Sequence, residues 1–266
     1  YLHEPRFVGN EKKYLLETID STFVSSVGPF VDQFEQEISK LTNTKKAIAV
    51  ANGTCALQIS LKLAGVKSED EVLTQALTFV ATANSISYLN ATPIFIDVDL
   101  DTMGLSPKAL QEFLEINVEL KDDGSYNKKT GKKISACLPM HTFGFMCRID
   151  EIVEICNQWK ISVVEDAAEA LGSEYKGRPS GSFGLLGAFS LNGNKIITSG
   201  GGGAITTNNI SIGDEAKYLT TTAKVPHKWE YTHDKLGYNF RLPNLNAALA
   251  CAQLEQLDNM KNSKKN

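Results

Sequence analysis

Residues 47–63, AIAVANGTCALQISLKL, decide the fold class of this chain. The apolar run 47–51 is too short for a helix and is typical of a buried strand. After the polar turn Asn52-Gly53-Thr54, leucines at positions 57, 61 and 63 indicate a helix. A buried strand that leads through a glycine-containing turn into a helix is the unit from which helix-covered sheets are built.

The same alternation runs along most of the chain. A helix is expected at 29–41, where Phe30, Phe34, Ile38 and Leu41 share one face. Further strands are expected near 72–74 and at 93–98, 134–140 and 161–165, with helices at 80–89, from Ser106, and at 150–160. Strands that alternate with helices predict an α/β protein, with a three-layer α/β/α arrangement around a mostly parallel sheet.

The composition fits a folded protein and excludes several kinds of partner. Of the 266 residues, 42% are hydrophobic and 22% are charged, which are ordinary values for a globular protein. The net charge of -4 offers no basic surface to nucleic acid, so an anionic ligand would have to be held locally. There is no apolar run of about 18 residues. Residues 1–6 lack the pattern of a signal peptide, so we expect neither a membrane span nor secretion.

The cysteines indicate a reducing environment. Their number is odd, they are scattered, and none forms a C-x-x-C pair, so a cytoplasmic protein fits better than a disulfide framework. His141, Cys147 and Cys156 lie near one another in the sequence without a recognised zinc spacing, so we predict no metal site. We expect buried, inert thiols.

Two segments stand outside the alternating pattern. Residues 121–133, KDDGSYNKKTGKK, are polar and charged, and we interpret them as a solvated surface loop. Residues 243–260 have a long helical pattern with leucines at 245, 249, 254 and 257. A helix of this kind should pack against another part of the molecule.

In a parallel sheet, ligands bind at the carboxyl ends of the strands, so the residues after each apolar run are candidates for chemistry. The turn Asn52-Gly53-Thr54 opens a helix, whose N-terminal N–H groups and dipole favour a phosphate. The glycine also lets the backbone approach a ligand closely. The alternative is a plain helix cap formed by the side chain of Asn52 or Thr54.

Asp166 is the second candidate, because it directly follows the strand at 161–165. A carboxylate at this edge can bind a metal ion or face a ring nitrogen. The small side chains of Ala167 and Ala168 leave room for a flat cofactor beside it. The alternative is a helix N-cap aspartate.

Lys195 is the third candidate. It lies in the polar turn 192–195 between two apolar strands and is followed by the glycine run 200–203. Glycines have no Cβ atoms to obstruct a cofactor. The alternative is a solvated surface lysine. The turn is not a P-loop, and no G-x-G-x-x-G opens a helix after a strand, so a dinucleotide site is disfavoured.

The three candidates fit one cofactor when they are taken together. Pyridoxal 5'-phosphate (PLP) forms a Schiff base with a lysine and acts as an electron sink when an aspartate keeps its ring nitrogen protonated. Its phosphate needs an anion site. Lys195, Asp166 and the helix start at Gly53-Thr54 would supply these three functions from one edge of the sheet.

At this point the whole chain resembles the DegT/DnrJ/EryC1/StrS family of sugar aminotransferases, which have the large domain of PLP-dependent transferases of fold type I. The motifs that carry the resemblance are VSSVG at 24–28 before Phe34-Glu35, NGTCAL at 52–57, TFVATAN at 78–84, EDAAE at 165–169, the stretch from Phe189-Ser190 to Lys195, and GYNFR at 237–241.

The resemblance implies a role for each matching residue. Lys195 and Asp166 would be catalytic, as the Schiff-base lysine and the partner of the ring nitrogen. Phe79 would cover one face of the ring. The implied cofactor-binding residues are Asn52, Gly53, Thr54, Phe79, Asp166, Glu169, Ser190, Lys195 and Asn239. Asn239 would reach the phosphate of the neighbouring subunit in a homodimer. Ser25, Ser26, Val27 and Gly28, together with Asn52, would border the nucleotide sugar.

Glu169 departs from the pattern of many relatives, which have histidine or glutamine three residues after the aspartate. An ionised glutamate can only accept hydrogen bonds. Glu169 would therefore be protonated, or it would lie against the cofactor ring differently.

Within the family, residues 2–7 (LHEPRF) and 25–28 (SSVG) resemble enzymes of the legionaminic-acid and bacillosamine pathways of bacterial surface glycans. The resemblance implies transfer of an amino group from glutamate to C4 of a UDP-linked 4-keto-6-deoxy-N-acetylhexosamine. A GDP- or dTDP-linked keto sugar, as in perosamine synthesis, is the alternative substrate. A PLP-binding regulatory protein without turnover is also left open. A sugar dehydratase is disfavoured, because that group has histidine in place of Lys195.

Members of the family also carry a smaller C-terminal domain. We expect residues 1–242 to form the large PLP-binding domain. Residues 243–266 would be the start of the helix that leads to the small domain, which this chain lacks.

Overall fold

The computed structural model describes residues 4–265 of the chain. Leu2 and His3 of the opening motif, and Asn266 at the other end, lie outside the described residues. Within residues 4–265, no helix is both long enough and apolar enough to cross a lipid bilayer.

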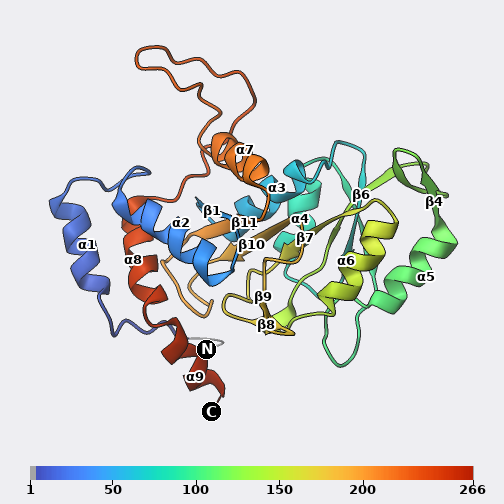
Figure 1. The fold of residues 1–266 in the computed structure, drawn as a ribbon, viewed down its shortest axis with the longest axis horizontal. Coiled ribbons are helices and arrows are strands. Elements are labelled where there is room, and N and C mark those ends of the chain that lie inside the picture. The colour runs from blue at the N-terminus through green and yellow to red at the C-terminus, as the bar shows by residue number, and fades with distance from the viewer. Residues whose placement is uncertain (1–3, 266) are drawn as a thin grey trace.

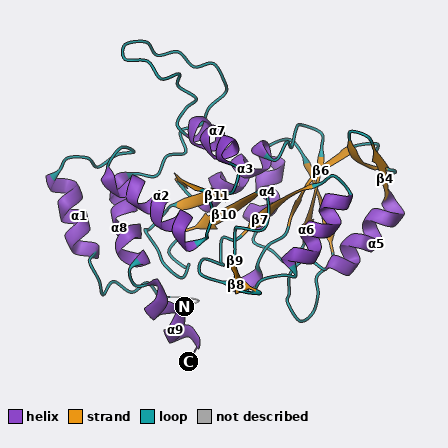
Figure 2. Ribbon diagram, in the orientation of Figure 1, coloured by secondary structure: helices purple, strands orange, loops and turns teal. Residues whose placement is uncertain are grey.

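One mixed sheet runs through the molecule (Figures 1 and 2). Its strand order is β1-β11-β10-β7-β6-β2-β3, and β11 is the one strand of this path that runs antiparallel to its neighbours. The strands are β1 (Lys46–Val50), β2 (Glu71–Gln75), β3 (Thr92–Ile96), β6 (Lys133–Leu138), β7 (Ser162–Asp166), β10 (Leu186–Ser190) and β11 (Gly203–Thr207). The prediction of a mostly parallel sheet is confirmed.

Helices cover both faces of the sheet, so the predicted three-layer α/β/α arrangement is also confirmed. The helices are α1 (Glu11–Asp20), α2 (Pro29–Leu41), α3 (Gly53–Leu63), α4 (Val80–Ser87), α5 (Pro107–Asn117), α6 (Ile149–Gln158), α7 (Ile210–Thr220), α8 (Asn244–Leu254) and α9 (Leu257–Lys265). A short 3-10 turn, η1, spans Thr142–Gly144, and a small separate hairpin pairs β8 (Glu174–Tyr175) with β9 (Arg178–Pro179).

Three apolar clusters fix these layers. Helices α3, α4 and α7 pack on one face through a cluster that includes Leu57 and Ile86. The opposite face is shared: α5 and α6 cover the half near β2 and β6, and α2 and α8 cover the half near β1 and β11. Burial of these side chains is the main stabilising term, at roughly 25 cal/mol per Å² of apolar surface.

Helix α8 packs through residues that the leucine pattern did not indicate. Its fully buried residues include Ala247, Ala250 and Cys251, which contact the cluster around α2. Small side chains let the two helices approach closely. Leu245 and Leu249 are only half-buried.

The segment 121–133 is not the solvated loop that the sequence predicted. Val118–Lys121 (β4) and Gly124–Asn127 (β5) form a hairpin, and β5 pairs with β6 at the edge of the sheet. The buried Glu71 carboxylate accepts hydrogen bonds from Asn127 and Thr130, which anchors the hairpin. Backbone pairing and these polar contacts hold a segment that lacks apolar residues.

A long excursion joins α7 to α8 and projects from the body of the molecule (Figure 1). We call residues 224–238 the arm. A bridge between Lys224 and His233 ties its two halves together. Trp229 and Tyr231 are exposed on it, by 77% and 79%.

Candidate active site

The residues selected from the sequence gather at one edge of the sheet. Strands β1, β10, β7, β6 and β2 run in one direction, so their carboxyl ends share this edge. Gly53, Ser190, Asp166 and Phe79 come at or shortly after the ends of four of them. This is the edge at which parallel sheets bind ligands.

The first part of the site is the start of α3. The side chain of Asn52 caps this helix, because its Oδ1 accepts a hydrogen bond of 2.9 Å from the backbone N–H of Cys55. The N–H groups of Gly53 and Thr54, in the first turn, have no acceptor within the helix. A Cβ atom on Gly53 would lie 2.8 Å from Cβ of Ser190, so only glycine allows this approach. The Ser190 hydroxyl and the helix N-terminus therefore form one small polar cradle.

Lys195 is not a solvated surface charge. Its side chain is 12% exposed, and Nζ lies 3.1 Å from Oε1 of Glu169. The other oxygen of Glu169 accepts a hydrogen bond of 2.9 Å from the backbone N–H of Phe143 in η1. Glu169 thus holds the lysine amine and the η1 turn together.

Asp166, the last residue of β7, is 2% exposed. Its carboxylate accepts hydrogen bonds from Thr82 Oγ1 at 2.7 Å and from the backbone N–H of Ala168 at 3.2 Å. Burial raises the pKa of Asp166, whereas these two hydrogen bonds and the charges of His141 and Lys195 lower it. The next helix along the chain is α7, so Asp166 is not a helix N-cap.

Thr82 connects Asp166 to the segment that carries Phe79. Thr82 is fully buried on α4, and its hydroxyl also lies 2.6 Å from that of Thr78. Phe79 is the residue before α4, and its ring is 64% exposed. An exposed ring beside a buried carboxylate offers a flat apolar surface to a ligand.

A cavity of about 730 Å³ opens beside Lys195 and Glu169. Its wall also includes Phe143, Phe145 and Lys261. This volume lies within the range of small-molecule sites, roughly 300–1,000 Å³.

The remaining predicted residues lie at the surface. The loop Ser25–Gly28 is anchored by α8, because the backbone N–H of Asn244 donates to the carbonyl of Ser25 and a Cβ on Gly28 would lie 2.3 Å from Asn244 Cγ. Val27 is 70% exposed. Asn239 is exposed at the base of the arm, and its Oδ1 accepts a hydrogen bond of 2.9 Å from Arg241 Nε. Within one chain, none of these contacts reaches Lys195 or Asp166.

Sequence reasoning missed two residues that contact Asp166. Thr82 lies inside the motif at 78–84 but received no role. His141 follows β6 directly, and its backbone N–H donates to the carbonyl of Asp166. The rule of inspecting each strand end would have found His141, but histidine was considered there only as a zinc ligand.

The site fits the chemical needs of PLP. The α3 N-terminus with Ser190 is a cradle for an anion, and Asp166 is a buried carboxylate that a protonated ring nitrogen would pair with. Lys195 is a shielded amine at a cavity of suitable size.

Comparison with known proteins agrees with this composition of the site. The sequence model of the DegT/DnrJ/EryC1/StrS aminotransferase family matches residues 5–266. The protein EpsN of Bacillus subtilis (strain 168), whose name assigns it as a pyridoxal phosphate-dependent aminotransferase, is 42% identical over 97% of this chain and 64% of its own length. GDP-perosamine synthase of Escherichia coli O157:H7 is 37% identical over 97% of this chain and 66% of its own length.

A solved structure extends the likeness to three dimensions. The aminotransferase from Psychrobacter cryohalolentis superposes with a TM-score of 0.85 at 30% identity, over 97% of this chain and 64% of that one. The chain thus spans slightly less than two thirds of the length of these relatives.

Proposed function

Because the chain belongs to the DegT/DnrJ/EryC1/StrS aminotransferase family and has the α/β architecture of PLP-dependent transferases of fold type I, we propose that it belongs to an enzyme that transfers an amino group to a nucleotide-linked keto sugar. The observation that carries the proposal is the shared edge of the sheet. There a buried carboxylate, a shielded lysine and a helix N-terminus meet beside one cavity.

Each residue has a distinct task in this proposal. Gly53, Thr54 and Ser190 bind the cofactor phosphate through N–H and O–H donors at the positive end of α3. Asp166 holds the ring nitrogen in its protonated form, and Phe79 lies against one ring face. When bound, the cofactor supplies an electron sink for the carbanion that forms at the amino carbon.

Lys195 provides both the attachment point and the movable proton. Its amine is the nucleophile for the cofactor aldehyde, and it later carries a proton between the substrate carbon and the cofactor carbon. Glu169 lies 3.1 Å from this amine and orients it whenever it is free. This gives Glu169 a role at the lysine, where a histidine or glutamine would place a different group.

For the substrate we propose a UDP-linked 4-keto-6-deoxy-N-acetylhexosamine aminated at C4, with glutamate as donor. The motifs at 2–7 and 25–28 support this choice, and the exposed loop Ser25–Gly28 can border a nucleotide sugar. A GDP-linked keto sugar is the second candidate. It is favoured by the likeness to GDP-perosamine synthase.

We further propose a homodimer in which Asn239 binds the cofactor phosphate of the partner. Asn239 is exposed and its contacts do not reach the cradle at Gly53 of its own chain. The arm beside it presents Trp229 and Tyr231 to the surroundings, and such aromatic residues are enriched at protein interfaces.

The test begins with cofactor binding. Purified protein mixed with PLP should gain a visible absorption band that borohydride bleaches, and peptide mass spectrometry should then find the pyridoxyl group on Lys195. Attachment at another lysine would refute the assignment of the site. A protein that binds PLP at Lys195 but never releases 2-oxoglutarate from glutamate would favour the non-catalytic alternative.

A further inference from the structure

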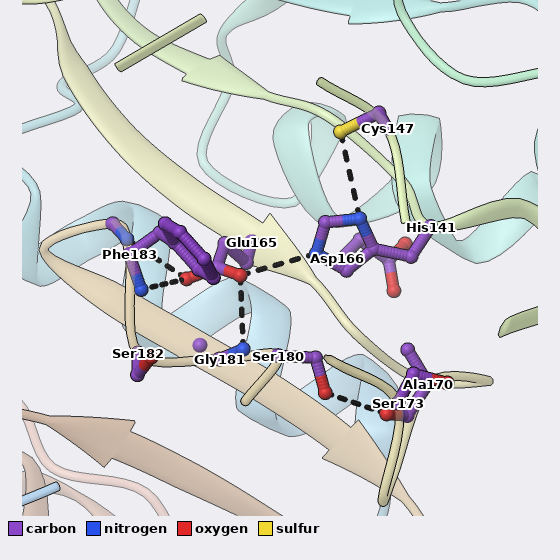
Figure 3. A network of polar contacts seen from close by, with 12 residues as sticks. His141, Cys147, Glu165, Asp166, Ala170, Ser173, Ser180, Gly181, Ser182 and Phe183 are labelled. Carbon is purple, nitrogen blue, oxygen red and sulfur yellow. Dashed lines mark hydrogen bonds and ion pairs between the residues drawn. The ribbon is translucent and has the colours of Figure 1, made fainter. Parts of the chain in front are cut away.

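A buried polar network lies directly behind Asp166, and the proposed chemistry has not used it (Figure 3). Neighbouring residues of a strand point to opposite faces of the sheet. Val164 packs with α3, and Val163 packs with α6. Asp166 therefore lies on the α3 face, toward the proposed cofactor, whereas Glu165 points to the α6 face.

Glu165 is fully buried and accepts four hydrogen bonds. Three come from backbone N–H groups of one loop: Gly181 at 2.9 Å, Phe183 at 2.7 Å and Gly184 at 2.8 Å. The fourth partner is Nε2 of His141, at 3.1 Å. A carboxylate with four donors is held in its ionised form. Glu165 thus fixes the loop before β10 at the cost of a buried negative charge.

His141 is the partner that can balance this charge. Its ring is fully buried, with Nε2 facing Glu165 and Nδ1 lying 3.5 Å from the sulfur of Cys147. Burial lowers the pKa of His141, but the contacts with Cys147 and Glu165 raise it further, to about 10. An imidazolium can donate from both nitrogens, and this geometry provides an acceptor for each.

The charges at the end of β7 show why the balance matters. Glu165 and Asp166 are adjacent buried carboxylates, and like charges at close range raise each other's pKa. Glu169 is already paired with Lys195. Without a cation at His141, the charge of Glu165 would act on Asp166 and favour the neutral form of Asp166, which cannot hold a ring nitrogen protonated.

We propose that His141 is a positioning residue that neutralises Glu165 and thereby keeps the Asp166 carboxylate ionised for the ring nitrogen of the cofactor. The inference rests on the proposed function, since it assigns a role toward the PLP ring. The backbone contact between His141 N–H and the Asp166 carbonyl, 3.1 Å long, holds the two residues in register.

The experiment measures a ratio of affinities rather than activity. Dissociation constants are determined for PLP and for an analogue with carbon in place of the ring nitrogen. Only PLP gains from an ionised Asp166, so the wild-type protein should prefer PLP, and Asp166→Asn should remove the preference. His141→Gln keeps a donor toward Glu165 without the charge. It should reduce the preference about tenfold, the effect of one pKa unit, while the affinity for the analogue stays unchanged.

The double variant His141→Gln/Glu165→Gln separates charge from structure. It removes both charges, so it should recover preference relative to His141→Gln alone. If His141→Gln weakens both ligands equally and leaves the ratio unchanged, the residue is merely structural and the proposal is overturned. If the wild-type protein shows no preference and Asp166→Asn changes nothing, the proposed cofactor site itself is wrong.

A measurement on the unaltered protein guards against a variant that does not fold. Nitrogen-15 spectra should show protons on both ring nitrogens of His141 at neutral pH. A neutral ring there would overturn the proposal.

Discussion

The inner and outer halves of the candidate site differ sharply in how far one chain completes them. In the inner half, Asp166 and Ser190 are 2% and 9% exposed, and each functional side chain has a protein partner. In the outer half, Phe79 and Val27 are 64% and 70% exposed, and Asn239 contacts only its near neighbour Arg241.

The difference separates chemistry from recognition. Groups that must stabilise charge work best when they are preorganised and shielded from water, as Asp166 is. Groups that recognise a large substrate or a second subunit must be accessible before binding. Variants in the inner half should therefore affect rate and cofactor affinity most, and those in the outer half should affect specificity and assembly.

Lys195→Ala should have the largest effect. It removes the attachment point and the movable proton in one step, so transamination should be abolished while the phosphate cradle can still hold PLP. Turnover is measured as 2-oxoglutarate released from glutamate. Lys176→Ala, at an exposed lysine paired with Asp150, is the matched control and should behave as wild type. Substantial turnover by Lys195→Ala would refute the central assignment.

Asp166→Asn should come second, with a loss on the order of a thousandfold in kcat. The amide is nearly isosteric and can still accept the hydrogen bond from Thr82, so the fold should survive. It carries no negative charge and cannot hold a ring nitrogen protonated. Steady-state kinetics, with thermal unfolding as the check on folding, measures the effect. Activity within tenfold of wild type would mean that the carboxylate has only a structural role.

The inner half was largely predictable from the sequence. Gly53, Asp166 and Lys195 follow apolar runs, and a parallel sheet brings such positions to one edge whatever lies between them. Glycine at 53 was expected for close approach, and the structure finds that approach toward Ser190.

Other features depend on contacts that no local pattern encodes. The pairing of Glu169 with Lys195 joins side chains 26 residues apart, and the hydrogen bond from Thr82 to Asp166 joins residues 84 apart. The hairpin formed by β4 and β5 was missed because its strands are polar, and backbone pairing with β6 stabilises them instead of apolar burial. The roles of Asn239 and Ser25–Gly28 came only from resemblance.

Gly53→Ala should rank third and act on cofactor affinity. The added methyl group would lie 2.8 Å from Ser190 Cβ, so the cradle must open. We expect PLP to bind about a hundredfold more weakly, since the anion site loses both its geometry and its tight contact. Gly193→Ala is the control, because a Cβ there meets nothing within 4 Å. Equal affinities in the two variants, measured by absorbance titration, would rule out the cradle.

In the outer half, substrate choice should give a smaller effect. We expect the UDP-linked 4-keto-6-deoxy-N-acetyl sugar to exceed its GDP- and dTDP-linked counterparts about tenfold in kcat/KM, which corresponds to roughly 1.4 kcal/mol of transition-state binding. The three sugars are compared with glutamate as common donor. Preference for the GDP sugar would transfer the assignment to the second candidate and leave the aminotransferase chemistry intact.

The smallest expected signal tests whether the outer half is completed by a second chain. Lys195→Ala and Asn239→Ala should each be inactive alone, because every site in either homodimer lacks one of the two residues. After exchange in an equal mixture, about half of the dimers are hybrids, and one of the two sites in each hybrid has both residues. Activity should therefore recover to about a quarter of the wild-type value. If Asn239 acts within its own chain, no site in the mixture is complete, and activity stays at zero. Native mass spectrometry must show hybrids in the silent mixture before that result counts against the shared site, and circular dichroism must show that both variants are folded.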